Sequence, residues 1–469
     1  MNSRRLFATA LLMILLLPIV ARCDDSPKAG DVRLEKRKYK SWSGKTGEYE
    51  VGTFFVKENR SEPDSRIISI GFSRFRAEKP TAPPVFFLPG GPGNSFQETG
   101  DDPRLRKTPF YVEYLWDECD VILVDQRGYS RRGEVLTGYF KGQEPKPDQT
   151  LDDRVAEYKH IARSISKYYA TTKTDLRGYT VLECVEDVNE LRKALGYEKI
   201  SLRGQSFGCQ WSFAFMRKHP ELVERALLSG IEPLDHTYDM PSHMFAAVKR
   251  MWKTIDADPR YARYLPKGGM KEAAETVIKR LENGPIEVRA RNIFGFGPPP
   301  VVQALGPDDF PWDEPNEILE LYHGQMQRWS RPRQRMSGTG VLIHPLIDSS
   351  LGVTPERRNR LRDDPAVRYL SRKNFAFLLA TADIWPTVDV GDEFRKPARC
   401  EIPVVFVNGD WDLKTPIENM LEIAPYFANS HSVTVHHAGH GTITGTMYRE
   451  HPRVLQQLMT FLLAGSMAD

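Results

Sequence analysis

The sequence predicts an α/β protein with a mostly parallel central sheet, helices on both faces of the sheet and an inserted helical cap. Short, continuously apolar segments recur along the chain, as expected of central strands buried on both faces. Segments with apolar residues every three or four positions alternate with these strands, which favours parallel pairing. The alternation breaks off over residues 235–398, where strand signals are few, and resumes near residue 402.

Composition and charge are those of a soluble globular protein. The chain has 469 residues, of which 40% are hydrophobic and 27% are charged, both ordinary proportions for a folded domain. The net charge of +3 is small, so no nucleic-acid partner is expected. The length is consistent with one large domain that carries an insertion, or with two to three domains.

The N-terminus has the pattern of a signal peptide. Arg4 and Arg5 precede an apolar stretch from Leu6 to Val20, and the small residues Ala21 and Cys23 follow. This apolar stretch is short for a membrane span. Residues 1–23 are therefore predicted to be removed, leaving an exported protein, periplasmic or secreted, without a stable membrane span. An uncleaved anchor and a lipidated Cys23 are the alternatives.

Four cysteines remain after residue 23, namely Cys119, Cys184, Cys209 and Cys400. An even number in an exported chain permits disulfides, and the pairing is left open. The spacing contains no C-x-x-C pair and suggests no zinc site. Cys209 falls in a helix expected to be buried and is predicted to be a packed thiol.

The elements follow one another in the order that the fold requires. Residues 24 to about 45 are polar and are expected to be loosely ordered. The predicted strands are Tyr49–Val56, Ile68–Phe72, Val85–Leu88, Val121–Val124, Lys199–Leu202, Ala226–Leu228, Ile402–Val407 and Ser432–Val435. The predicted helices are Leu182–Leu195, Cys209–His219 and a final one over Val454–Leu462. This order divides the chain into a first core part (24–234), a cap (235–398) and a second core part (399–469).

A G-x-S-x-G pentapeptide, Gly204 to Gly208, joins a strand to a helix. A serine at such a sharp turn presents its hydroxyl above the sheet, so Ser206 is the predicted nucleophile. The helix that begins there directs backbone N–H groups at a developing anion. The N–H of Phe207 is one predicted oxyanion donor. The second comes from Gly90, Gly91 or Gly93 after Leu88, and Gly91 is preferred.

A serine nucleophile needs a base and a carboxylate that orients the base. On a sheet of this kind both come later in the chain, each after a strand, with the acid first. Asp410 and Asp412 follow one strand, and a histidine group that contains His440 follows the next. These histidines do not have the spacing of a metal site. No metal or organic cofactor is expected.

These motifs closely resemble the prolyl aminopeptidase family of α/β-hydrolases, and especially its secreted tripeptidyl-aminopeptidase-like branch. The matching segments are Val56–Arg60, Pro89–Gly93, Asp125–Gly128, Gly204–Gly208, Gly409–Pro416 and Gly439–Gly441. The resemblance implies an α/β-hydrolase fold. It also implies that Asp412, three residues before Thr415-Pro416, is the acid, and that His440, between two glycines, is the base.

The sequence departs from that family at two points. Many members have a histidine at the position of Pro89. The proline is more similar to the tripeptidyl branch. The Trp-Glu and Glu-Asn cap motifs of the proline-specific enzymes are not found. An aminopeptidase needs a carboxylate that pairs with the substrate ammonium, and Glu232 at the cap entrance is the preferred residue. Asp235 and Asp239 are weaker alternatives, and a carboxylate that caps a turn is the structural alternative for Glu232.

The expected function is that of an exported serine peptidase whose partner is a peptide substrate. It would hydrolyse bonds near the free N-terminus through Ser206, His440 and Asp412. An esterase or amide hydrolase on the same fold is the alternative within the class, because fold and triad do not determine the substrate. A non-catalytic binding protein is the alternative from another class. The oligomeric state is left open.

Overall fold

The computed structural model describes residues 26–40, 44–96, 112–141, 146, 149–289, 302–325 and 337–466. The predicted signal peptide at residues 1–23, with Cys23, lies outside these described residues. Within them, no helix combines the length and the apolar run that a bilayer crossing requires.

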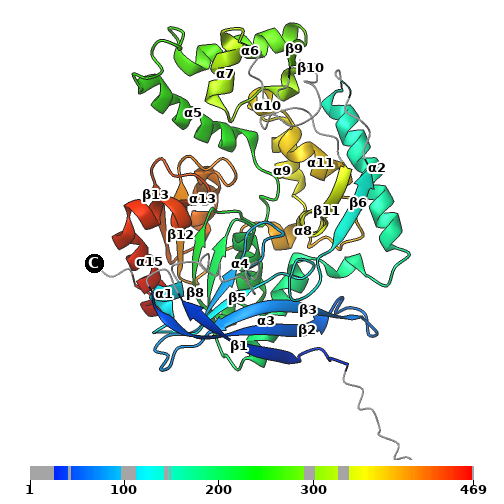
Figure 1. Cartoon of the computed structure of the whole chain (residues 1–469), viewed down its shortest axis with the longest axis vertical. Coiled ribbons are helices and arrows are strands. Elements are labelled where there is room, and N and C mark those ends of the chain that lie inside the picture. The colour runs from blue at the N-terminus through cyan, green and yellow to red at the C-terminus, as the bar shows by residue number, and fades with distance from the viewer. Residues whose placement is uncertain are drawn as a thin grey trace, which may run out of the picture.

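A nine-stranded sheet forms the centre of the molecule, in the order β1-β2-β3-β5-β4-β7-β8-β12-β13 (Figure 1). The strands are β1 (Val32–Lys40), β2 (Thr46–Lys57), β3 (Ile67–Phe75), β4 (Val85–Leu88), β5 (Val121–Val124), β7 (Ile200–Gln205), β8 (Val223–Ser229), β12 (Val404–Gly409) and β13 (Ser430–Val435). From β5 to β13 all neighbours pair in parallel. The pairs at the β1 edge, up to β3 with β5, are antiparallel.

Both faces of this sheet are covered, as the continuously apolar strands predicted. Along β4, Phe86 and Leu88 pack in one hydrophobic cluster, whereas Val85 and Phe87 pack in the other. The first cluster contains residues of α2 (Leu151–Tyr169), α3 (Val181–Ala194) and α4 (Phe207–Lys218). The second contains residues of α1 (Val112–Leu115) and α15 (Pro452–Ala464). The predicted fold class is therefore confirmed.

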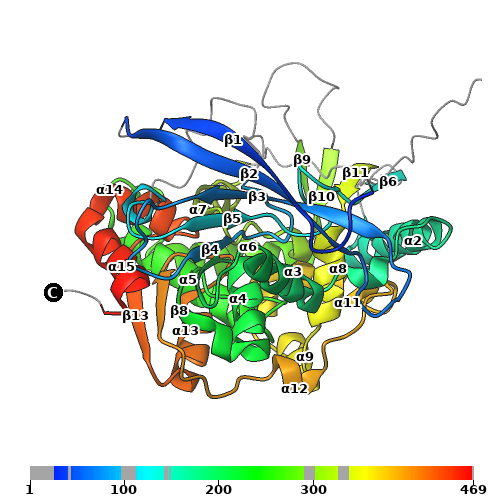
Figure 2. The same cartoon turned by 90° about the horizontal axis from the view of Figure 1, so that it is seen from below.

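The expectation of a loosely ordered segment from 24 to about 45 is wrong over β1. This strand pairs with β2 along its whole length, from Val32 opposite Phe54 to Lys40 opposite Thr46. It forms the outer edge of the sheet (Figure 2). Most of its side chains are exposed, so its stability comes from main-chain pairing and leaves no apolar alternation in the sequence. Charged side chains are common on such edges, where they discourage pairing with another chain.

The segment between β8 and β12 is largely helical, and its first helices form the upper part of Figure 1. Its helices are α5 (Pro241–Ala257), α6 (Gly269–Asn283), α7 (Pro315–Tyr322), α8 (Ile343–Leu351), α9 (Pro355–Arg362), α10 (Val367–Leu370), α11 (Lys373–Thr381) and α12 (Asp392–Arg395). Residues of α5, α6 and α7 share a hydrophobic cluster of their own. The second core part adds α13 (Ile417–Ile423) and α14 (Tyr448–Glu450).

The segment also contains strands that its sequence did not predict. β9 (Ile286–Arg289) pairs with β10 (Val302–Leu305). β11 (Ser337–Val341) pairs with β6 (Thr137–Lys141), which belongs to the first core part. The glycines and hydroxyl residues of β11 give it no apolar run. The domain boundaries at 234 and 398 stay predictions.

Candidate active site

Ser206 occupies the sharp turn between β7 and α4. Its backbone φ is 56° and its ψ is −126°, an unusual conformation for a residue with a side chain. Glycines make this turn possible, because a Cβ on Gly204 would overlap Gly208 O, and a Cβ on Gly208 would overlap Leu88 O. The pentapeptide thus has the tight strand-to-helix geometry that its sequence predicted.

Asp412 and His440 are brought together at the ends of the neighbouring strands β12 and β13. His440 Nδ1 lies 2.9 Å from Asp412 Oδ2. Asp412 is almost completely buried. Its Oδ1 accepts the N–H groups of Lys414 and Thr415, both at 2.9 Å, and its Oδ2 accepts Thr415 Oγ1 at 2.7 Å. These bonds hold the carboxylate in one orientation toward the imidazole.

Asp410, the alternative acid, makes different contacts. Its Oδ2 lies 2.9 Å from His436 Nδ1, and its Oδ1 accepts the N–H of His437 at 2.7 Å. Of the two aspartates, only Asp412 contacts His440 among the described residues. Within the same residues, no group of three or more His, Cys, Asp or Glu side chains is arranged to hold a metal ion.

Ser206 and His440 line the same pocket of about 350 Å³. Gly90 and Gly91 line it as well. This brings the serine, the histidine and the glycine loop after β4 around one space. The pocket opens at the carboxyl ends of the strands, where ligands bind in open α/β sheets.

The loop after β4 is held by two buried residues at the end of β5. Gln126 Oε1 accepts the N–H of Gly93 at 2.6 Å. Asp125 Oδ1 accepts Ser95 Oγ at 2.7 Å and the N–H of Phe96 at 3.2 Å. Because the Gly93 N–H is engaged by Gln126, Gly90 and Gly91 are left as the glycine donors.

Phe207, the other predicted donor, is the first residue of α4. The first N–H groups of a helix have no partner within the helix. The N–H of Phe207 is therefore available at the turn that carries Ser206. Cys209, two residues further on, is a buried free thiol, as predicted, and its Sγ donates to Ser229 O at 3.2 Å.

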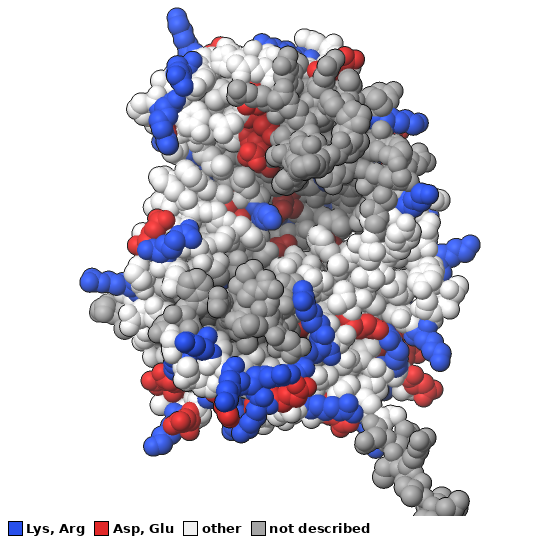
Figure 3. All heavy atoms as spheres, in the orientation of Figure 1, with Lys and Arg blue, Asp and Glu red and all other residues white. Residues whose placement is uncertain are grey.

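Carboxylates gather near Asp412, outside the set of residues that line the Ser206 pocket. Among the described residues, the side chains of Glu232 and Asp239 have no hydrogen-bond or ion-pair partner. Burial raises the pKa of Glu232 well above its usual value, and the charges of Asp239, Asp348 and Asp412 raise it further. Burial and the charges of Asp412 and Asp348 raise the pKa of Asp239 to about 8, although Arg357 opposes this shift. Figure 3 shows Asp or Glu atoms together with Lys or Arg atoms in the hollow between the upper and lower parts of the molecule.

Asp348 and Asp235, unlike Glu232 and Asp239, each have a polar partner. Burial raises the pKa of Asp348 to about 6, and the charge of His344 opposes this shift. Asp235 accepts both the N–H and the Oγ1 of Thr354, each at 2.7 Å. Asp235 therefore holds the N-terminus of α9, which is a structural role.

The Asp125–Gly128 and Val56–Arg60 motifs meet in a buried ionic clamp. Arg127 is fully buried and donates to Glu58 O at 2.6 Å and to Asp187 Oδ2 at 2.7 Å. Arg60 donates to Asp187 Oδ1 at 2.8 Å. The clamp ties the ends of β2 and β5 to α3. The sequence contains both motifs but does not predict that they form an ionic clamp.

Two family models match the chain. Residues 83–267 match the α/β-hydrolase fold model, and residues 368–469 match the model described as TAP-like protein. The first match covers the glycine loop and the Ser206 turn, and the second covers Asp412 and His440. No curated protein matches the chain.

Many solved structures match at low similarity. One is a thermophilic esterase from Thermogutta terrifontis, at 17% identity and a TM-score of 0.36, covering 87% of this chain and 97% of that one. Another is a 2-hydroxy-6-oxo-6-phenylhexa-2,4-dienoate hydrolase from Rhodococcus sp. strain RHA1. It is 13% identical with a TM-score of 0.36, and the match covers 91% of this chain and 99% of that one. The strand order, the Ser206 turn and the two family models lead to one conclusion: the chain is an α/β-hydrolase of the tripeptidyl-aminopeptidase-like family.

Proposed function

We propose that this hydrolase is an exported serine peptidase that cleaves peptide bonds near the free N-terminus of its substrate. The main support is the arrangement of Ser206, His440 and the glycine loop around one pocket, with Asp412 bonded to the far side of the imidazole. The TAP-like family model at residues 368–469 adds support for a peptidase.

In the proposed reaction, Ser206 Oγ attacks the scissile carbonyl while His440 Nε2 accepts the hydroxyl proton. Asp412 accepts the Nδ1–H of His440, which fixes the tautomer and stabilises the imidazolium. The N–H groups of Phe207 and Gly91 stabilise the oxyanion. His440 then donates the proton to the leaving amine, which leaves an acyl-enzyme that water hydrolyses by the same steps in reverse.

The unpaired carboxylates of Glu232 and Asp239 support a requirement for a free substrate amine. A desolvated carboxylate without a partner is unfavourable, and a substrate ammonium would supply the missing partner in a charge-assisted hydrogen bond. The raised pKa values of both groups are those of carboxyls that lack a nearby cation strong enough to offset burial. Glu232 is therefore the proposed amine anchor, and Asp239 is proposed to act with it.

A substrate panel tests this proposal. It compares a tripeptidyl anilide with a free amine, the same anilide with an acetylated amine, and a simple aryl ester. We expect the acetylated anilide to lose about 100-fold in kcat/KM, because the carboxylates then stay unpaired. Equal cleavage of the free and acetylated anilides would sink the aminopeptidase assignment. An ester hydrolysed far better than both would favour the esterase.

Two variants locate the anchor. Glu232→Gln should raise KM for the free-amine anilide with little change in kcat, as expected when binding is lost equally from ground and transition states. Glu224→Gln is the matched control, because Glu224 lies in β8 beside Lys199, with its carboxylate 3.9 Å from the ammonium. If both variants behave like the wild type, Glu232 is not the anchor.

Export is the last part of the proposal. It rests on the Arg4-Arg5 pair and the apolar Leu6–Val20 stretch. Mass spectrometry of the mature protein should find an N-terminus close to residue 24. An intact Met1 would favour an uncleaved anchor, and a diacylglycerol adduct on Cys23 would identify a lipoprotein.

A further inference from the structure

A second and larger cavity lies at the opposite ends of the strands from Ser206. Its volume is about 730 Å³, within the range of small-molecule sites. Val223 at the beginning of β8 and Ile402 just before β12 line it, whereas Asp412 follows the carboxyl end of β12. The Ser206 pocket is therefore separate from this cavity.

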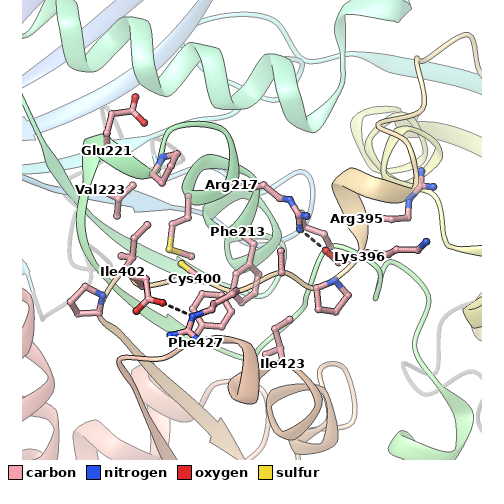
Figure 4. Close-up of a pocket in the computed structure, with 18 residues that line it drawn as sticks. Phe213, Arg217, Glu221, Val223, Arg395, Lys396, Cys400, Ile402, Ile423 and Phe427 are labelled. Atoms are coloured by element: carbon pink, nitrogen blue, oxygen red, sulfur yellow. Dashed lines mark hydrogen bonds and ion pairs between the residues drawn. The ribbon is translucent and has the colours of Figure 1, made fainter.

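One wall of the cavity is apolar. Its main side chains are Phe213, Met216, Val223, Ile402, Ile423 and Phe427. Figure 4 shows Phe213 and Phe427 in the middle of this wall, with Cys400 beside them. Phe213 is 6% exposed and Phe427 is 8% exposed, whereas many core residues behind them are at 0%. The residual surface of the wall faces the cavity, where an apolar ligand would cover it.

Arg217 stands at one side of this wall, on α4 (Figure 4). Its guanidinium donates to Lys396 O at 2.5 Å and to Glu393 O at 3.0 Å. Both acceptors are neutral carbonyls, and no carboxylate among the described residues forms an ion pair with Arg217. Burial lowers the pKa of Arg217, although the charge of Glu393 opposes this shift. An anion would therefore find a partly desolvated cation without a carboxylate partner.

The neighbouring cations already have carboxylate partners. Arg395 pairs with Asp389 and Asp392. Lys396 pairs with Glu393 at 3.3 Å, and Arg399 pairs with Glu401 at 2.6 Å. The attraction for an anion is therefore concentrated at Arg217, next to the apolar wall.

We propose that this cavity binds a single-chain amphiphile with a carboxylate head, that is, a fatty acid. The carboxylate lies at Arg217, and the alkyl chain lies along Phe213 and Phe427. A zwitterionic peptide fits less well, because its amide groups would lose water against the apolar wall without gaining partners there. This site is independent of the proposed peptidase activity.

Calorimetric titration with dodecanoate, below the concentration at which it forms micelles, tests the site. Dodecanol is the neutral comparison, and an unmodified, zwitterionic tripeptide is the peptide comparison. We expect one dodecanoate per chain and weaker binding of dodecanol. Arg217→Gln should weaken dodecanoate about tenfold or more without changing dodecanol. Arg263→Gln, at a surface arginine whose guanidinium lies against the ring of Tyr264, should change neither.

A second variant and a second readout guard against loss of folding in Arg217→Gln. Ala398→Trp adds bulk at an exposed position in the lining and should abolish binding of both amphiphiles. Cys400 is half-buried in the lining, whereas Cys119, Cys184 and Cys209 are buried elsewhere. Dodecanoate should slow iodoacetamide alkylation of Cys400, measured by peptide mass spectrometry.

Any one of the following outcomes would overturn the proposal. They are no saturable binding of dodecanoate, equal binding of dodecanoate and dodecanol in the wild type, dodecanoate binding that survives Ala398→Trp, and tighter binding of the tripeptide. The catalytic substitution Ser206→Ala should leave dodecanoate binding unchanged. If Ser206→Ala abolished binding, the amphiphile would be held in the catalytic pocket instead.

Discussion

At the scale of single residues, the two aspartates after β12 differ in what their carboxylates contact. Asp412 holds His440, whereas Asp410 contacts His436 and the main chain of His437. Asp412→Asn should lower kcat by up to about 10⁴-fold, because the imidazole loses its orienting carboxylate. Asp410→Asn is the matched control and should cost less than about tenfold. Steady-state kinetics on the free-amine anilide decides, and the reverse ranking would show that the acid is misassigned.

Gln126 is a second residue with a testable role. It holds the N–H of Gly93 and thereby the loop that carries Gly91. Gln126→Leu should lower kcat by about 10²-fold with little change in KM, because small displacements of a catalytic donor are costly. The variant should also bind a boronate analogue of the tetrahedral intermediate more weakly. A loss of thermal stability with unchanged kcat would mean that Gln126 acts only in folding.

Asp239 predicts a pH dependence of stability. Its pKa is about 8 in the folded protein, against an ordinary value of 3.8. Between these values the folded state holds a proton that the unfolded chain has released, so this contribution to stability decreases as pH rises. Asp239→Asn carries no titrating proton and should be more stable than the wild type at pH 8, with a smaller difference at pH 5. Urea unfolding at both pH values measures this, and a constant difference would contradict the assignment.

Much of the candidate site follows from residue order alone. A serine, an aspartate and a histidine, each after a predicted strand, must meet at the carboxyl edge of a parallel sheet. The partners of Gln126 could not be predicted, because its contact is a main-chain N–H in a distant loop. The different partners of Asp410 and Asp412 could not be predicted either, because they depend on the direction in which each side chain points.

At the scale of elements, the sequence predicts strands best where both faces of the strand are buried. β4, β5 and β12 are buried on both faces and read as apolar runs. β1 is exposed on most positions, and β11 contains glycine and hydroxyl residues. Both are held by main-chain bonds to a partner strand, which leave no periodic signal in the side chains. Their existence therefore could not be predicted from this sequence.

The Arg127 clamp makes a prediction at this scale. Arg127→Ala leaves Asp187 buried without its main partner and should lower the free energy of unfolding by about 3–5 kcal/mol. Arg177→Ala is the control, because that exposed arginine pairs with Asp175 and Glu62 at the surface and should cost less than about 1 kcal/mol. Equal losses in urea unfolding would show that the clamp contributes no more than a surface pair.

At the scale of the whole molecule, two sites lie at opposite ends of the strands of the sheet. The Ser206 pocket lies at the carboxyl ends of the strands, and the larger apolar cavity lies at their amino ends. The first could be predicted from sequence, because catalytic residues follow strands in a known order. The second could not, since its wall is assembled from α4, α13 and the segment that leads from the cap to β12.

Ser206 is the proposed nucleophile of an acyl-transfer site. Reaction with a fluorophosphonate, followed by intact-mass measurement and peptide mapping, tests it most directly. The predicted result is one adduct per chain on the Ser206 peptide, strongly slowed in His440→Ala and absent in Ser206→Ala. An adduct on another residue, or an active enzyme that forms no adduct, would contradict the account.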